Sequence, residues 1–187
     1  MIFVTVGTQL PFDRMMRACD AWYASSGQGT QVFGQTGRLS VDNFAPRFPH
    51  TEELSPQEFD QRLAEARLIV SHAGMGTIIS ALTLGKPIVV VPRRAHLGEQ
   101  RNDHQVATVK KFADRPGVFV SMTERELPGI LDRVCQQDLA FGCAEQTTAA
   151  QKSLISAVRN EIFKAGGNVS RERDAPGRGV SCTPSDD

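Results

Sequence analysis

Short apolar runs alternate along this chain with stretches of helical periodicity, and this alternation restricts the fold more than any other feature of the sequence. The runs occupy residues 2–6, 68–70, 87–91 and 118–120, with weaker candidates at 31–34 and 50–54. Each is too short to be a core helix. Strands that are apolar on both faces are typical of parallel sheets, because helices cover both sides of such a sheet. The sequence therefore predicts an α/β fold, with a parallel sheet and helices on both faces.

The segments between the runs carry helix signals. After the first strand, apolar residues recur at helical spacing: Phe12, Met15, Met16, Cys19, Trp22 and Tyr23. Ser55-Pro56-x-Glu58 and Thr123-x-x-Glu126 have the form of capping boxes, which begin helices. We expect a last helix over residues 143–165 and one domain over residues 1–165. Periodicity is then lost, so residues 166–187 are expected to form a disordered tail.

Composition excludes several classes of protein. The 187 residues include 21 Lys plus Arg and 21 Asp plus Glu, so a formal net charge of zero gives no overall attraction to nucleic acid. The four cysteines include no Cys-x-x-Cys pair, which argues against a disulfide framework and a zinc site. No stretch approaches the roughly 20 apolar residues that span a bilayer, and no secretory leader is visible. We therefore expect a cytoplasmic protein.

Polar turns follow three of the predicted strands, at residues 7–9, 72–77 and 93–105. Ligands of parallel sheets bind beyond the carboxyl ends of the strands, where these turns would lie. Gly74 and Gly76 allow the backbone of the second turn to lie close to a ligand. The helix that follows would point its first N–H groups at that ligand, and such a terminus attracts phosphate. Alternatively, the two glycines serve only to pack a tight turn between strand and helix.

The absence of three known sequence motifs argues against several kinds of phosphate-binding site. The chain has no Gly-Lys-Ser/Thr, no Gly-x-Gly-x-x-Gly and no Asp-x-Asp. Their absence argues against an ATPase loop, a dinucleotide site and a metal-clamped diphosphate. Helix N-termini and neutral donors would then have to stabilise the charge of a diphosphate. Polar side chains of Asn102, His104 and Gln105 could read sugar hydroxyls.

The other polar side chains of the third turn have simpler interpretations. His96, Glu99 and His104 do not share the His-x-x-x-His spacing of a helical metal site, so we expect no metal. Arg93 and Arg94 are candidate phosphate ligands, but we expect them on a solvated face of the loop.

Several of these segments together resemble a known family. They are residues 1–9 (MIFVTVGTQ), residues 71–77 (SHAGMGT), Gly85-Lys86-Pro87 and residues 102–105 (NDHQ). The combination is similar to the carboxyl-half domain of GT-B glycosyltransferases, of the glycosyltransferase family 28 C-terminal type. More narrowly, it resembles the group of Alg13-like and bacterial exopolysaccharide or capsule transferase subunits, over about residues 1–165. The resemblance implies a Rossmann-like sheet that forms a single half of a GT-B fold.

The resemblance also implies which residues bind the UDP-sugar donor of such enzymes. Near the diphosphate it places Gly7, Thr8, Gln9, His72, Ala73, Gly74, Met75, Gly76 and Thr77. Near the sugar it places Asn102, Asp103, His104 and Gln105, and near the base and ribose it places Glu53, Leu54 and Ser80. Many members carry a carboxylate at the position of Ser80, and a hydroxyl is a weaker acceptor for the ribose hydroxyls.

By this resemblance the chain is the donor-binding subunit of a two-component, membrane-associated hexosyltransferase that extends a lipid-linked oligosaccharide or polysaccharide precursor. The acceptor half would be an Alg14-like, membrane-anchored partner, which recruits this chain to the cytoplasmic face of a membrane and carries the catalytic base. No cofactor is implied besides the UDP-sugar substrate. The apolar face of the last helix, which ends near Ala165, fits docking of that partner and packing on its own domain equally well.

Two other functions fit the same residues. One is a non-enzymatic regulatory subunit that binds nucleotide or only a protein partner. The other is a different UDP-sugar enzyme, such as an epimerase, that a second chain completes. Transfer activity that depends on Gln105 would argue against the first, and turnover of a UDP-sugar without any acceptor would favour the second.

Overall fold

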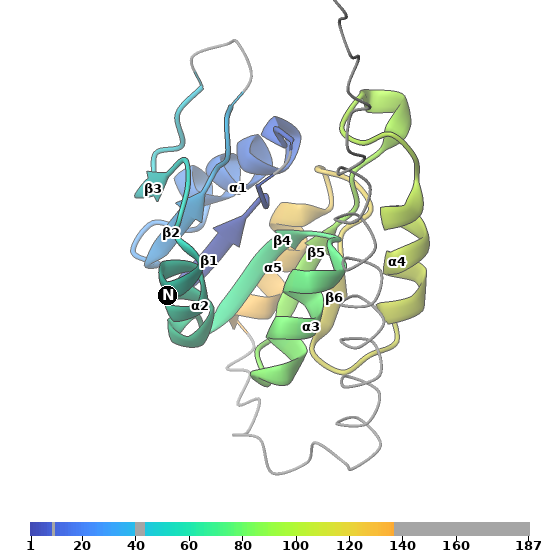
Figure 1. Ribbon diagram of the computed structural model, residues 1–187. Helices are drawn as coiled ribbons and strands as arrows, with labels where there is room; N and C mark the ends of the chain where they lie inside the picture. Colours follow the sequence, from blue (N-terminus) through green and yellow to red (C-terminus); the bar gives the residue numbers. More distant parts are fainter. Residues whose placement is uncertain (9, 40–43, 137–187) are drawn as a thin grey trace, which may run out of the picture. The chain divides into compact units, whose positions relative to one another are not determined.

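The computed structural model of the protein describes residues 1–8, 10–39 and 44–136, and six parallel strands form one sheet (Figure 1). The strands are β1 (Ile2–Thr5), β2 (Val32–Gln35), β3 (His50–Thr51), β4 (Leu68–His72), β5 (Ile88–Val91) and β6 (Val118–Val120). Their order across the sheet is β3-β2-β1-β4-β5-β6. Each neighbouring pair is parallel, which confirms the predicted sheet.

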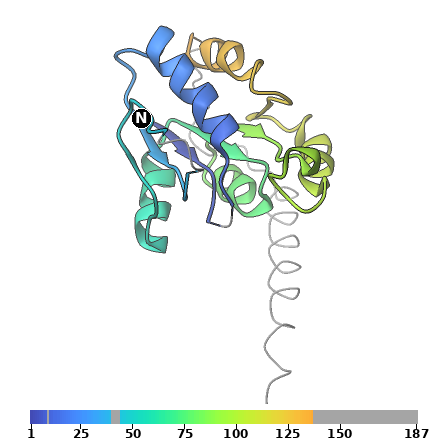
Figure 2. The ribbon, with the colours of Figure 1, turned by 90° about the horizontal axis from the view of Figure 1, so that it is seen from above.

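Helices cover both faces of this sheet, as Figure 2 shows from above. They are α1 (Asp13–Ser25), α2 (Pro56–Glu65), α3 (Met75–Thr83), α4 (His104–Phe112) and α5 (Leu127–Gln136). A 3-10 helix, η1 (Ala95–Leu97), lies in the loop before α4. Helices α1 and α5 pack on one face, and α2, α3 and α4 cover the other. The α/β fold with helices on both faces is therefore confirmed.

Successive residues of each strand point to opposite faces, so the sheet contributes to two cores. Ile2 and Val4 of β1 pack with α1 and α5, whereas Phe3 packs with α2, α3 and α4. All three side chains are at most 1% exposed. Burial of apolar surface stabilises a fold by about 25 cal/mol per Å², and here it occurs on both faces. This is why the strands are apolar throughout rather than alternating.

The order of the strands reverses between β1 and β4. From β1 the chain moves outward through β2 to β3, returns to β4 on the other side of β1, and moves outward again through β5 to β6. Thr5 pairs with Ser71 near the carboxyl ends of β1 and β4, so the turns that follow these strands are neighbours. Ligands of open α/β sheets bind at such a switch point.

The two predicted capping boxes have different outcomes. At α2 the Ser55 hydroxyl accepts the Glu58 N–H at 3.3 Å and the Glu58 carboxylate accepts the Ser55 N–H at 2.9 Å, which confirms the box. Before α5 the Glu126 carboxylate accepts the N–H of Met122 at 2.9 Å, one residue earlier than the predicted box requires. The prediction was wrong there because a turn already forms, in which the Thr123 carbonyl accepts the Glu126 N–H.

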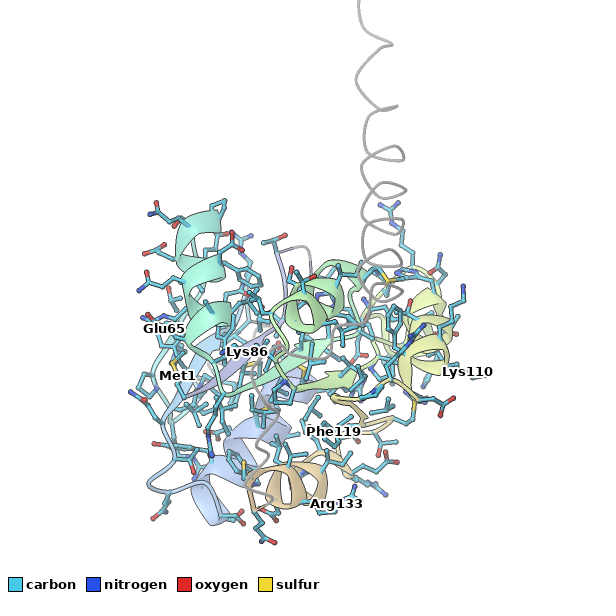
Figure 3. All side chains as sticks on the ribbon, turned by 90° about the horizontal axis from the view of Figure 1, so that it is seen from below. Met1, Glu65, Lys86, Lys110, Phe119 and Arg133 are labelled. Carbon is cyan, nitrogen blue, oxygen red and sulfur yellow. The ribbon has the colours of Figure 1, made fainter. Side chains whose placement is uncertain are left out.

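Figure 3 shows the end of the sheet at which the strands begin, opposite to the end that carries the predicted polar turns. Met1 lies there before β1, and its carbonyl accepts the Arg67 N–H at 2.9 Å. Glu65 at the end of α2 and Lys86 before β5 lie at the same edge (Figure 3). The polar turns that were predicted to bind a ligand lie at the other edge, after the strands.

Three predictions concern residues outside the described ranges: the last helix over residues 143–165, the tail over residues 166–187, and Gln9. Among the described residues, no helix has the length and apolar character needed to cross a membrane.

Candidate functional site

A cavity of about 510 Å³ opens at the carboxyl ends of β1 and β4. We call one side of it the strand-end wall, which consists of Val6, Gly7, Thr8, Leu10, Gln35, His72, Gly74 and Arg93. We call another side the α2 wall, which consists of Leu54, Pro56, Phe59 and Asp60. The start of α3 adds Gly76 and Thr77, and the region around the start of α4 adds Gln100, His104 and Gln105. Cavities of this size hold small-molecule ligands.

The amino end of α3 faces this cavity through Gly76 and Thr77. Gly74 is the N-cap residue, and no side chain among the described residues caps the helix. The N–H groups of Met75, Gly76 and Thr77 therefore have no acceptor within the helix. Together with the helix dipole, such N–H groups form a site that attracts an anion.

Two glycines make room for the ring of His72. A Cβ placed on Gly7 would lie 2.7 Å from His72 Nε2, and one placed on Gly74 would lie 2.8 Å from the same atom. Any larger residue at either position must therefore displace the ring. Gly7 also has a φ of +77°, which other residues rarely adopt. Its N–H donates to the Thr5 hydroxyl at 3.3 Å, so Gly7 contributes space to the site rather than a donor.

The ring of His72 is neutral at physiological pH. Burial and, after it, the positive charge of Arg93 lower the pKa of His72 to about 4. His72 Nδ1 lies 3.2 Å from Nε2 of Gln105, and Gln105 Oε1 accepts the backbone N–H of Arg93 at 3.0 Å. Gln105 was predicted near the sugar. It does line the cavity, but both ends of its amide are bonded within the fold and it is only 3% exposed.

Arg93 is buried, so the prediction that it lies on a solvated loop face was wrong. Only 3% of it is exposed. Its guanidinium donates to the carbonyl oxygens of Val6 at 2.9 Å, Leu10 at 2.6 Å and Pro11 at 2.6 Å. Burial lowers the pKa of Arg93 to about 10, which still leaves it charged at neutral pH. These carbonyls satisfy the buried donors, and in return Arg93 fixes the loop that follows β1.

An ion pair holds the loop that follows β5. Glu99 accepts from Arg14 Nε at 2.7 Å and from the backbone N–H of Arg94 at 2.9 Å. The side chains of Arg14 and Glu99 are 15% and 11% exposed. Glu99 is therefore committed to arginines rather than available to a metal with His96 and His104. In the described part of the chain, no group of three or more His, Cys, Asp or Glu residues could hold a metal ion.

The cavity brings together about half of the predicted site residues. Those that line it are Gly7, Thr8, Leu54, His72, Gly74, Gly76, Thr77, His104 and Gln105. Those that do not are Glu53, Ala73, Met75, Ser80, Asn102 and Asp103. Asn102 accepts the His104 N–H at 3.2 Å and Asp103 accepts the Ala95 N–H at 2.9 Å, so these two side chains shape the turn before α4.

Most of the α2 wall was not predicted from the sequence. Pro56, Phe59 and Asp60 are spaced i, i+3 and i+4, so they share one face of α2. Phe59 packs edge-on against Phe3, with ring centroids 5.6 Å apart. The capping box at Ser55 was the available signal, because it fixes where α2 begins. Helices that cover a parallel sheet begin at the edge where the strands end, which is the edge of the polar turns.

The fold and the site together define a class of protein. A parallel sheet that reverses its order beside a cavity, with an uncapped helix terminus at that cavity, is a Rossmann-like ligand-binding domain. Within this class, the chain belongs to the glycosyltransferase family 28 C-terminal domain family, which it matches over residues 1–162. The resemblance to GT-B glycosyltransferases is therefore confirmed.

One curated relative and two solved structures illustrate this similarity. The UDP-N-acetylglucosamine transferase subunit ALG13 of Yarrowia lipolytica is 28% identical over 112 residues, which is 50% of this chain and 54% of that relative. MurG of Acinetobacter baumannii has a TM-score of 0.58 at 21% identity, covering 87% of this chain and 49% of MurG. A solution structure of ALG13 has a TM-score of 0.50 at 18% identity, covering 87% and 96%. The chain thus spans about half the length of the curated relative and of MurG, and the two structures share its fold.

Proposed function

We propose that this domain binds the UDP-sugar donor of a glycosyltransferase whose acceptor-binding half is a second, Alg14-like membrane-anchored chain. The observation that carries the proposal is the cavity at the switch point, where the uncapped start of α3 lies beside neutral His72. The family match supports transfer chemistry. The Yarrowia relative is itself named as a subunit of a UDP-N-acetylglucosamine transferase, which supports both the nucleotide and the need for a partner.

The donor diphosphate would lie against the start of α3. The N–H groups of Met75, Gly76 and Thr77 and the Thr77 hydroxyl are donors there. Arg93 also lines the cavity, but both terminal nitrogens of its guanidinium donate to backbone carbonyls. Its charge therefore acts through space, while helix N–H groups contact the phosphate oxygens. Such preorganised donors stabilise charge on a departing diphosphate without a metal ion.

The uridine would lie along the α2 wall. Leu54, Pro56 and Phe59 offer apolar surface to the base, and Asp60 is the acidic residue among the described residues of the cavity. A carboxylate has two oxygens and can accept hydrogen bonds from both hydroxyls of a ribose. Asp60 rather than Ser80 takes this role in our proposal, because Ser80 does not line the cavity.

The sugar would lie toward Gln100 and His104, beyond the start of α3. His104 is exposed and lines the cavity, in contrast to Asn102 and Asp103. Apart from Asp60, no carboxylate of the described residues lines the cavity. The general base that activates an acceptor hydroxyl is therefore assigned to the partner chain.

Calorimetric titration with UDP tests the donor site. We expect the wild-type chain to bind UDP, and Gly74→Val to weaken binding by at least about a hundredfold, because the new side chain displaces His72 into the cavity. Gly129→Val is the matched control, since a Cβ at Gly129 in α5 meets no described residue within 4 Å. Absence of UDP binding by folded wild-type protein would refute the proposal, as would equal binding by Gly74→Val.

A transfer assay tests the need for a partner. The chain would be co-expressed with a membrane-anchored candidate, and the membranes would be assayed with a panel of UDP-sugars. We expect transfer only when both chains are present. UDP binding without transfer by the reconstituted pair would instead identify a regulatory subunit, and turnover of a UDP-sugar without an acceptor would identify an epimerase.

A further inference from the structure

The Gln105 side chain connects the end of β5 to the ring of His72. Its Oε1 lies 3.0 Å from the backbone nitrogen of Arg93, and its Nε2 lies 3.2 Å from His72 Nδ1. A backbone N–H can only donate, so the amide oxygen must face Arg93 and the amide NH2 must face His72. The orientation of this amide is therefore fixed by chemistry, and it is held in place by burial, because Gln105 is only 3% exposed.

The proton on the His72 ring follows from this orientation. An amide NH2 donates, so His72 Nδ1 must accept, and a neutral imidazole with an accepting Nδ1 carries its proton on Nε2. The Nε2 edge of the ring lies between Gly7 and Gly74, both of which line the cavity. His72 Nε2 therefore lies at the wall of the cavity, between the loop after β1 and the residue that caps α3.

We propose that Gln105 is a positioning residue that holds His72 in its Nε2–H form, so that the ring acts as a neutral hydrogen-bond donor to the donor diphosphate. This inference rests on the proposed function, and it replaces the predicted role of Gln105 as a reader of sugar hydroxyls. The alternative ring form, with its proton on Nδ1, would turn the Nε2 lone pair toward phosphate oxygens. Two acceptors would then face each other, and binding would weaken.

Burial and Arg93 keep the ring from acting as a cation, although groups of both charges lie around it. Arg93 lies at the end of β5, and Arg14 of α1 and Glu99 of the following loop lie behind it. Asp60 of α2 and His104 of α4 line the same cavity. Burial and Arg93 hold the pKa of His72 near 4, so the ring is neutral from about pH 5 upward. The position of its one proton, rather than its charge, then decides whether it donates.

Nitrogen NMR of the imidazole rings tests the first half of this inference. Long-range proton–nitrogen correlations distinguish a protonated ring nitrogen from an unprotonated one. We expect His72 in the wild-type chain to show a protonated Nε2 and an unprotonated Nδ1, with no titration between pH 8 and pH 5. A proton on Nδ1, or titration near pH 6.5, would overturn the inference.

Binding of UDP by Gln105→Glu tests the second half. The new carboxylate can only accept, so it draws the ring proton to Nδ1 and raises the pKa of His72. We expect UDP affinity relative to wild type to fall about tenfold at pH 8, the effect of one lost hydrogen bond to a charged group, and to recover toward pH 5.5 as Nε2 regains a proton. Taking the ratio to wild type at each pH cancels the titration of UDP itself.

The matched control is Leu54→Glu, which adds the same charge to the α2 wall of the cavity rather than to the helix that carries Gln105. It should weaken UDP binding by a factor that does not recover as the pH falls. If the UDP affinity of Gln105→Glu relative to wild type were also independent of pH, the inference would be overturned. Gln105→Met, which has a similar shape and no donor, covers the case in which the charged variant fails to fold. Gln105→Met should weaken binding of UDP itself. Loss of a residue that contacts only the sugar would instead weaken binding of UDP-sugars and leave binding of UDP unchanged.

The outcomes separate this inference from the proposed function. If the wild-type ring has the expected proton on Nε2 but UDP does not bind, the role toward the diphosphate fails together with the proposed function. If UDP binds and neither Gln105→Glu nor Gln105→Met changes its affinity, the donor site stands and the positioning role of Gln105 is refuted.

Discussion

The strand-end wall and the α2 wall border the same cavity but are built differently. On the strand-end wall, Arg93 and His72 are bonded to backbone carbonyls or to the buried Gln105, and both have strongly shifted pKa values. On the α2 wall, the polar group is Asp60, an exposed carboxylate on a helix surface. The strand-end wall is rigid, which suits it to hold the diphosphate of the proposed donor in one position. The α2 wall can tolerate sequence change, so substitutions there should have smaller effects on UDP binding and stability.

The largest effect should come from removing the buried cation of the strand-end wall. Arg93→Met leaves the carbonyls of Val6, Leu10 and Pro11 without their donor, so we expect the free energy of unfolding to fall by about 3 kcal/mol or more. Arg94→Met is the neighbouring control. Its guanidinium donates to the Met122 carbonyl, and losing that bond should reduce stability by about 1 kcal/mol. Urea denaturation measures the free energy of unfolding of both variants, and equal losses in the two would contradict this prediction.

Lowering the pH should reduce the stability of the fold through His72, which lies on the same wall. The pKa of His72 in the fold is about 4, below its ordinary 6.5. Between these two pH values, His72 is mostly protonated in the unfolded chain but mostly neutral in the folded chain. Stability therefore falls as the pH drops from about 6.5 toward 4, by up to about 3 kcal/mol. Urea denaturation of wild type and His72→Asn at several pH values isolates this contribution. A difference between them that does not change with pH would contradict it.

At the start of α3, ligand binding and stability should respond in opposite directions. Gly76→Ala adds a methyl group at a position that meets no atom of the described residues within 4 Å, and Ala favours a helix by about 0.5–1 kcal/mol over Gly. The methyl group would occupy space where a diphosphate approaches the helix, so we expect UDP affinity to fall about tenfold. Gly129→Ala should bring the gain in stability alone. Calorimetry and thermal unfolding of both variants give the comparison.

The smallest effect should come from the α2 wall. Asp60→Asn keeps the shape of the side chain but removes a charged acceptor, so we expect UDP binding to weaken about fivefold. The wild-type chain should prefer UDP over 2′-deoxy-UDP, and this preference should become smaller in Asp60→Asn, because a neutral amide is a weaker acceptor, while Asp13→Asn retains it in full. If Asp60→Asn kept the preference in full, the ribose would have to be placed elsewhere.

Much of the fold was predictable because its causes are local. Apolar runs identified the strands, and the box at Ser55 identified the start of α2. Gly7, His72 and Gly74 were also predictable, since each lies at or just beyond the end of a strand. Arg93 was not, because its acceptors at Val6, Leu10 and Pro11 lie more than eighty residues earlier in the chain. Polar character alone gives no sign that a loop residue will be buried.

The turn before α4 shows a second limit. The polar run from Asn102 to Gln105 was predicted to face the sugar as a group, but α4 begins at His104. Asn102 and Asp103 therefore lie in the turn, where their side chains accept backbone N–H groups. Gln105 lies on the buried side of the first helical turn. The sequence identified a segment that reaches the cavity, whereas the direction of each side chain depended on the residue at which the helix starts.

The contact of two glycines with one imidazole has a consequence for how this chain can vary. Gly74 has an ordinary backbone conformation, with a φ of −79°, and the nearest obstacle to a larger residue there is the His72 ring. A saturation library that varied one site at a time would score Gly74 as intolerant. Paired randomisation of positions 72 and 74 should recover alanine at the second when the first is serine, which would mark the two codons as an epistatic unit.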